Sequence, residues 1–150
     1  MKTSPGSTMR PEVVSVRRVL RDFEGTWQIA RDIRPEVGPP ARFEGQGVWT
    51  PQANGLAYLE RGFLTLEGVA PMQAERRYYW QHDLSVFFED GRFFHQVPAA
   101  GGQTEHWCDP DQYKVTYDFS DWPGFEVSWD VRGPRKAYRM NSRFTPLARP

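Results

Sequence analysis

From Thr26 onward, apolar and polar residues alternate with a period of two, and stretches containing Gly or Pro interrupt this alternation many times. A period of two is typical of a β-strand, whose successive side chains point to opposite faces. The pattern predicts about ten strands, over residues 26–33, 43–49, 56–66, 73–80, 84–89, 92–97, 104–108, 112–119, 125–132 and 136–145. Because closure of such a meander removes both exposed edges, we predict an all-β fold, a single antiparallel up-and-down barrel.

The start of the chain departs from this alternation. Residues 1–11 are rich in Ser, Thr, Gly, Pro and Lys, and we expect them to be disordered. Apolar residues between Glu12 and Phe23 recur near helical spacing, which predicts a short amphipathic helix that closes one end of the barrel. The expected organisation is therefore a disordered segment over residues 1–11 and one barrel domain over residues 12–150.

Charge and cysteine content narrow the function classes. The chain has 19 Lys and Arg against 19 Asp and Glu, so no net charge attracts nucleic acid or a membrane surface. Cys108 is the single cysteine, no secretory signal is recognisable at the start, and no apolar run is long enough to span a bilayer. We expect a cytoplasmic protein without nucleic-acid or membrane partners, whose oligomeric state and cofactors stay open at this point.

Two turns predict which side chains face the interior near the histidines. Asp90-Gly91 is a strong hairpin signal, and a two-residue loop there pairs Phe88 with Phe93 and Val86 with His95, which places Phe93 and His95 inward. A four-residue loop over residues 109–112 pairs His106 with Val115 and Cys108 with Tyr113. Both histidines are then expected to face inward, close to tyrosines.

The turn over residues 133–136 gives the clearest register. A loop of Pro134 and Arg135 pairs Asp130 with Arg139 on the outer surface. The same register pairs Trp129 with Met140 on the inner surface, where we expect both side chains to be buried.

The alternation also places charged groups inside the barrel, namely Arg31, Glu60 and Arg76. A buried charge without a partner costs several kcal/mol, so these groups are expected to meet each other, water or a ligand. One interpretation is a Glu60–Arg76 pair that only bridges strands. The other is a pocket, which is favoured by inward glycines that leave space, at positions 45, 47 and 62, and by inward tyrosine hydroxyls.

These considerations define a candidate ligand-binding site made of Arg31, Tyr58, Glu60, Arg76, Tyr78, His95, His106, Tyr113 and Tyr117. The leading hypothesis is binding of a small, partly aromatic, anionic molecule, with Arg31 or Arg76 holding the anion. One alternative is an acid–base enzyme, a decarboxylase, isomerase or cyclase, that uses Glu60 or the two histidines. A second alternative is a haem-binding barrel with an inward histidine as axial ligand. We predict no metal site, because His95, His106 and Cys108 lack the close spacing of a metal-binding motif.

Several motifs carry a family resemblance. Residues 23–27, Phe-Glu-Gly-Thr-Trp, resemble the G-x-W start of lipocalins and their calycin relatives. Residues 58–62, 90–95, 106–111 and 129–138 are similar to a family of uncharacterised bacterial domains of unknown function with a calycin barrel. This resemblance covers nearly the whole chain from Phe23 and implies a fold but no activity. Other calycin-like barrels include haem-binding nitrobindins and phenolic acid decarboxylases, and the latter use interior Arg, Glu and Tyr groups.

Overall fold

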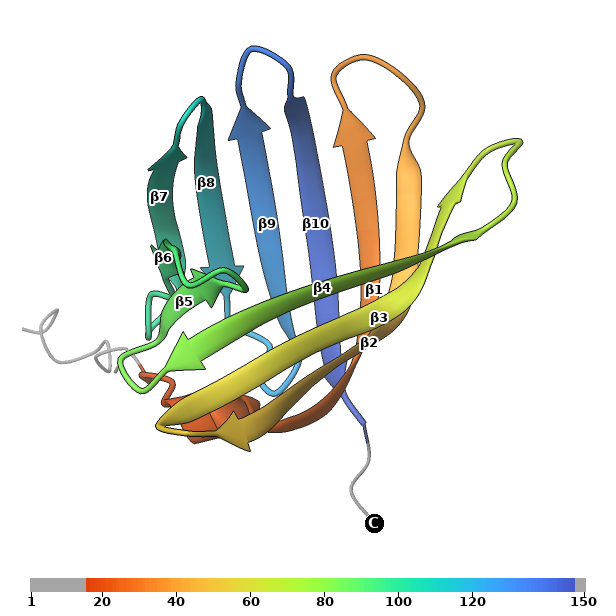
Figure 1. The fold of residues 1–150 in the computed structure, drawn as a ribbon. Coiled ribbons are helices and arrows are strands. Elements are labelled where there is room, and N and C mark those ends of the chain that lie inside the picture. Colours follow the sequence, from red (N-terminus) through yellow and green to blue (C-terminus); the bar gives the residue numbers. More distant parts are fainter. Residues whose placement is uncertain (1–15, 148–150) are drawn as a thin grey trace, which may run out of the picture.

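The computed structural model describes residues 16–147, which contain ten strands and one short 3-10 helix (Figure 1). In chain order the elements are η1 (Leu20–Phe23), β1 (Gly25–Pro35), β2 (Ala41–Gln52), β3 (Gly55–Leu66), β4 (Met72–Gln81), β5 (Ser85–Phe88), β6 (Phe93–Gln96), β7 (Gly102–Cys108), β8 (Asp111–Asp118), β9 (Phe125–Arg132) and β10 (Ala137–Pro146). All ten predicted strands are present.

The strands form one antiparallel sheet in the order β6-β5-β4-β3-β2-β1-β10-β9-β8-β7. Pairing of β1 with β10 brings the two ends of the meander together, and the sheet curls into a barrel (Figure 1). The edge strands β6 and β7 contact each other, but they share no backbone ladder within residues 16–147. The prediction of an antiparallel barrel is confirmed, and the barrel is nearly closed, with a seam between β6 and β7.

The N-terminal helix is shorter than predicted. Residues 1–15 lie outside the described residues, so neither the expected disorder of residues 1–11 nor the first part of the helix is described. Residues 16–19 are not helical, and the Arg18 N–H instead donates to the Ala99 carbonyl at 2.7 Å. Within residues 16–23, only η1 is helical, and its Phe23 is buried at one end of the barrel. Among the residues described, no helix could cross a lipid bilayer.

The register of β9 and β10 agrees with the turn chemistry. Asp130 pairs with Arg139 at 3.6 Å between Oδ2 and Nε, and Trp129 opposes Met140. Met140 is buried, whereas Trp129 is half-buried instead of buried. The guanidinium of Arg76 lies over the Trp129 ring, with Cζ 5.4 Å from the ring centroid, so this ring borders an opening and not a closed core.

The hairpin of β5 and β6 differs from the prediction by one residue. Val86 opposes His95 as expected, but Phe87 opposes Phe93, because a bulge inserts an extra residue into β6. That residue is Phe94, which is 1% exposed, whereas Phe93 is 46% exposed. The predicted inward position of Phe93 is therefore wrong, and Phe94 occupies the interior beside His95.

The turn between β7 and β8 is shorter than predicted. His106 opposes Tyr113 and Cys108 opposes Asp111, so the loop has two residues instead of four. The Asp111 carboxylate is buried against Gly133 and lies 3.3 Å from Lys136 Nζ, which holds Asp111 in the strand. Because the slip is an even number of residues, His106 keeps its predicted face.

The inward glycines of β2 and β3 do not leave space for a ligand, contrary to expectation. Gly45 opposes Gly62 in the ladder, and a Cβ atom at Gly62 would lie 2.7 Å from Gly45 Cα and 2.7 Å from Phe43 Cζ. At Gly47, a Cβ atom would lie 2.7 Å from Tyr58 Oη. These glycines instead admit aromatic rings and a close approach of two strands that curl across the barrel (Figure 1).

Candidate functional site

The barrel encloses a cavity of about 50 Å³. This is several times the roughly 10–15 Å³ that one water molecule needs. The cavity is mostly aromatic with a few polar groups, and its walls are formed by Arg31, Trp49, Tyr58, Glu60, Arg76, Tyr78, Trp80, Val86, Phe94, His95, Tyr117, Phe125, Val127, Trp129, Ser142 and Phe144. A concave aromatic space with few convergent polar groups is the usual form of a small-molecule site.

A buried ion pair forms one wall of the cavity. Arg31 on β1 and Glu60 on β3 make two parallel hydrogen bonds, 2.6 Å from Nη1 to Oε2 and 2.8 Å from Nη2 to Oε1. Arg31 Nε also donates to Ser142 Oγ on β10 at 2.6 Å, and the Tyr58 hydroxyl donates to Glu60 Oε1 at 2.7 Å. The two charged groups are therefore fully engaged with protein partners, although β2 separates their strands in the sheet.

The ion pair fixes the charge states of its members. Burial alone would raise the pKa of Glu60, but the hydrogen bonds and charge of Arg31 lower it below its usual value. Burial would likewise lower the pKa of Arg31, and Glu60 raises it overall. Burial raises the pKa of Tyr58 well above its usual value. At neutral pH, Glu60 is thus a carboxylate, Arg31 a cation and Tyr58 a neutral hydroxyl.

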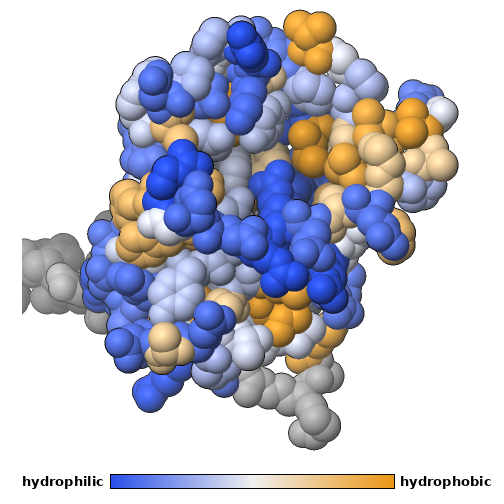
Figure 2. Space-filling model, viewed as in Figure 1, coloured by the Kyte–Doolittle hydropathy of each residue, from blue (hydrophilic) through white to orange (hydrophobic). Residues whose placement is uncertain are grey.

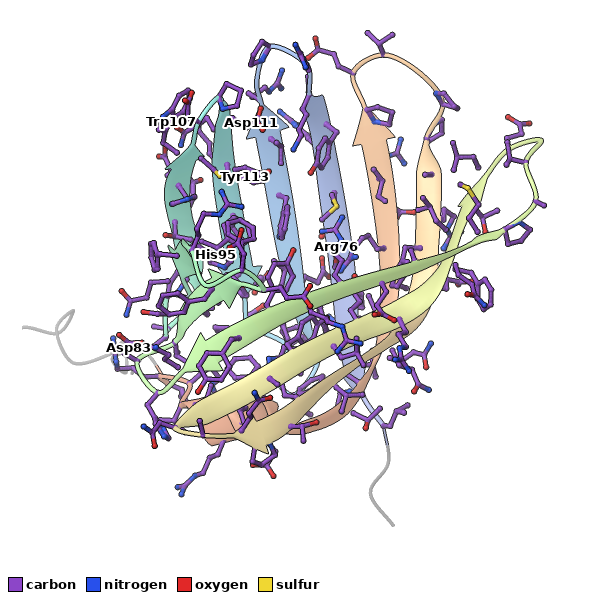
Figure 3. The ribbon with its side chains drawn as sticks, in the orientation of Figure 1. Arg76, Asp83, His95, Trp107, Asp111 and Tyr113 are labelled. Carbon is purple, nitrogen blue, oxygen red and sulfur yellow. The ribbon has the colours of Figure 1, made fainter. Side chains whose placement is uncertain are left out.

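Arg76 is a second cation at the same carboxylate. Its Nε lies 4.0 Å from Glu60 Oε2, and its side chain is 36% exposed. Strongly hydrophilic side chains gather over β3 and β4 in the middle of the face shown in Figure 2, and Figure 3 shows Arg76 extending from β4, in front of β10 in this view. Among the described residues that line the cavity, Glu60 is the only carboxylate, so Arg31 and Arg76 together leave one positive charge in excess there.

The strand register orders the cavity from an open end to a closed end. Arg76, Tyr78 and Trp80 are successive inward positions of β4, opposite Glu60, Tyr58 and Leu56 of β3. Arg76 is partly exposed and Trp80 is buried, so the cavity opens beside Arg76. Arg76 and Tyr78 also border an open groove of about 560 Å³ between β4 and the β5–β6 turn, so they separate the interior from solvent.

The closed end is sealed by η1. Phe23 is fully buried, and its ring packs against Trp49 and Trp80 with centroid distances of 5.7 and 5.1 Å. The same ring contacts Trp122 and Phe125 at 5.5 and 5.6 Å. The predicted closure of one barrel end by the N-terminal element is thus achieved by a single turn.

His95 is a neutral group in this cavity. Its Nε2 lies 2.9 Å from the Tyr117 hydroxyl, and burial, together with the nearby His106, lowers the pKa of His95 to about 3. Burial also raises the pKa of Tyr117. This His–Tyr pair is therefore uncharged over the whole physiological range.

The shifted pKa of His95 predicts a pH-dependent stability. An unfolded His95 binds a proton below its ordinary pKa of 6.5, whereas the folded one binds a proton only below about 3. Between pH 6.5 and about 3, the unfolded state binds more protons than the folded state. The contribution of neutral His95 to the free energy of unfolding is therefore fully present above pH 6.5 and is lost as the pH falls toward about 3. Urea denaturation of wild type and His95→Gln over this range is expected to show a smaller loss for the variant. The exposed His82 gives the control, since His82→Gln should follow the wild type, and parallel curves for all three proteins would contradict the prediction.

Of the nine residues expected at the site, seven line the cavity: Arg31, Tyr58, Glu60, Arg76, Tyr78, His95 and Tyr117. His106 and Tyr113 lie outside it, because Phe94 fills the space between them and His95. Figure 3 shows His95 and Tyr113 on the same side of the barrel, near β5 and β8. The expected Glu60–Arg76 ion pair is present at 4.0 Å, but Arg31 is the closer partner of Glu60, at 2.6 Å.

Several cavity residues were not expected from the sequence. Ser142 and Trp129 lie on faces that the alternation predicts to be inward, but no charge or motif distinguishes them from core residues. The alternation predicts Phe94 on the face opposite that of Phe93 and His95, so Phe94 reaches the cavity only because of the bulge. Trp49 lies in the predicted strand over residues 43–49, but nothing in the sequence distinguishes it from the other core aromatic residues.

The cavity combines one buried ion pair with one neutral histidine–tyrosine pair. Glu60 is held ionised by Arg31, and His95 stays neutral beside Tyr117. Nε2 of His95 is bonded to the Tyr117 hydroxyl, so this nitrogen would have to give up that bond to ligate a haem iron. Within residues 16–147, no cluster of three His, Cys, Asp or Glu side chains could hold a metal ion.

Comparisons with known proteins agree with the fold. Residues 23–146 match a family described as "Family of unknown function (DUF6314)". The structure is similar to the S-type phycobiliprotein lyase CPES from Guillardia theta, with a TM-score of 0.63 and 6% identity over 87% of this chain and 92% of the lyase. It also aligns with a de novo designed fluorescence-activating β-barrel, with a TM-score of 0.43 and 13% identity over 90% of this chain and 100% of the design. No curated protein matches the sequence significantly.

Proposed function

Since the chain belongs to DUF6314, a family of unknown function, we propose its function from the cavity itself: the barrel binds a small, partly aromatic, anionic molecule in its interior. Small barrels are either filled by side chains or hold one small ligand. The cavity of about 50 Å³ holds a few water molecules, so an aromatic ligand also requires some of the wall side chains to move.

The observation that carries this proposal is the second arginine. Arg31 has short bonds to Glu60 and Ser142, whereas Arg76 lies 4.0 Å from the same carboxylate. A carboxylate at the open end of the cavity would balance the excess positive charge and accept charge-assisted hydrogen bonds from Arg76. Arg31 then positions Glu60 and does not bind the ligand anion.

The aromatic walls suit the rest of the ligand. Tyr78, Trp80 and Trp129 line the cavity, and Trp129 already packs against the Arg76 guanidinium. Flat rings favour a planar or unsaturated ligand, through stacked or edge-to-face contacts.

The proposal predicts a charge-selective loss of affinity. Arg76→Met should weaken binding of benzoate by about 10- to 100-fold, as expected for a lost charge-assisted bond, and should change binding of the neutral isostere benzamide by less than about threefold. NMR titration of the pure protein with each probe measures both constants.

Arg77→Met is the matched control, because Arg77 is the next residue of β4 and pairs with Glu75 on the outer surface. It should leave both affinities unchanged. Equal losses for benzoate and benzamide in Arg76→Met would mean that Arg76 has a structural role, and absence of benzoate binding to the wild type would reject the proposal.

A further inference from the structure

Two residues that line the cavity each have a buried polar atom without a hydrogen-bond partner among the described residues. The two atoms are Nε1 of Trp49 and Nδ1 of His95, on side chains that are 2% and 3% exposed. A buried donor or acceptor that is left unsatisfied is costly, so such atoms usually have a partner in the functional state of a protein.

The surroundings of Trp49 explain why the protein supplies no partner. Its indole ring contacts Phe23, Tyr58 and Trp80, with centroid distances of 5.7, 4.4 and 5.3 Å. Aromatic rings offer no lone pair of the strength of a carbonyl or hydroxyl oxygen. The neighbouring Trp27, by contrast, donates from its Nε1 to the Phe23 carbonyl at 2.8 Å.

Trp49 and Arg76 lie at different positions along the cavity wall. Trp49 opposes Tyr58 of β3, whereas Arg76 opposes Glu60, two residues further along the same strand. Trp49 and Arg76 are offset by about 6.4–6.8 Å along the strands and by two strand spacings of about 4.8 Å each across the sheet. Both line the cavity, so a substituted aromatic ring in the interior can reach from one toward the other. A ligand whose carboxylate meets Arg76 therefore directs its other end toward Trp49.

We propose that the ligand carries a neutral hydrogen-bond acceptor, such as a carbonyl oxygen, at the end opposite its carboxylate, and that Trp49 Nε1–H donates to this acceptor. The proposal rests on the proposed function and narrows it to small aromatic carboxylates with an oxo group remote from the anion. His95 adds a second polar contact at this end. Val86 of β5 opposes Trp80 of β4 on one side and His95 of β6 on the other, so His95 and Trp80 lie at the same level of the barrel. Its neutral ring can donate or accept through Nδ1, according to the tautomer.

Two probes of nearly identical shape test this inference. Para-acetylbenzoate has a carbonyl oxygen where para-isopropenylbenzoate has a methylene group, and both carry the same carboxylate. We expect the wild type to bind the acetyl compound about five- to tenfold more tightly, the amount that one buried hydrogen bond contributes. Trp49→Phe should bring this ratio close to one.

Trp80→Phe is the control, because it replaces another tryptophan of the cavity wall by the same smaller ring. This variant should still bind the acetyl compound more tightly than the isopropenyl compound. If Trp49→Phe does not fold, the indole N–H signal of Trp49 in the wild type gives the answer: it should move downfield with the acetyl compound and not with the isopropenyl compound.

The outcomes separate this inference from the proposed function. Equal affinity of the wild type for both probes, or an unchanged ratio in Trp49→Phe, would mean that water satisfies the indole N–H, and would overturn the inference. Loss of benzoate affinity in Arg76→Met would still support the proposed function in that case. If the wild type binds none of the carboxylates, both proposals are wrong.

Discussion

Replacement of Glu60 by alanine is expected to lower the free energy of unfolding by about 3–5 kcal/mol. The carboxylate accepts two hydrogen bonds from Arg31 and one from Tyr58, and both charged side chains are buried. Without it, Arg31 would keep a buried positive charge and lose its strongest partner. The cost comes mainly from this uncompensated charge, because desolvation offsets most of what an intact buried pair contributes.

Two further variants test that explanation. Arg31→Met combined with Glu60→Leu removes both charges and should recover much of the lost stability, as measured by urea denaturation. Glu75→Ala removes an exposed carboxylate that pairs with Arg61 and Arg77, and should cost less than about 1 kcal/mol. Similar losses in Glu60→Ala and Glu75→Ala would show that the interior pair is not desolvated.

Phe23→Ala is expected to cost about 3–5 kcal/mol, because it leaves a large cavity at the sealed end of the barrel. The ring of Phe23 is fully buried among Trp49, Trp80, Trp122 and Phe125. Thermal and urea denaturation measure the loss.

Phe63→Ala is the control for Phe23→Ala, since Phe63 is the same residue type and its side chain is 52% exposed. It should change the free energy of unfolding by less than about 1 kcal/mol. A small effect of Phe23→Ala would mean that η1 rests on the barrel without sealing it.

The sequence predicted the strands well because their side chains alternate and their turns are short. The register of β9 and β10 was predictable because a Pro-containing turn and two opposite-charge pairs, Asp130–Arg139 and Glu126–Arg143, favour the same alignment. Local chemistry and periodicity agree there, so no tertiary contact is needed to choose the register.

The predictions of register and loop length are wrong where contacts between residues distant in sequence determine the structure. The bulge that turns Phe94 inward has no local signal, because Phe93 and Phe94 are the same residue type. The β7–β8 loop is short because Asp111 packs against Gly133 and Lys136, which are distant in sequence. Alternation also predicts which face a charge occupies but not which charge it meets, so the contact of Glu60 with Arg31 across the barrel could not be distinguished from one with Arg76.

The seam between β6 and β7 determines how the cavity volume can change. Elsewhere around the barrel, adjacent strands are joined by backbone ladders, so widening the interior there would break regular hydrogen bonds. Across the seam, the contacts are between side chains, such as His106 with Phe93 and Phe94 at centroid distances of 5.7 and 5.9 Å. The barrel is therefore mechanically most compliant along this one line, and a guest larger than the resting cavity can be accommodated by rotating a few rings while the sheet stays intact.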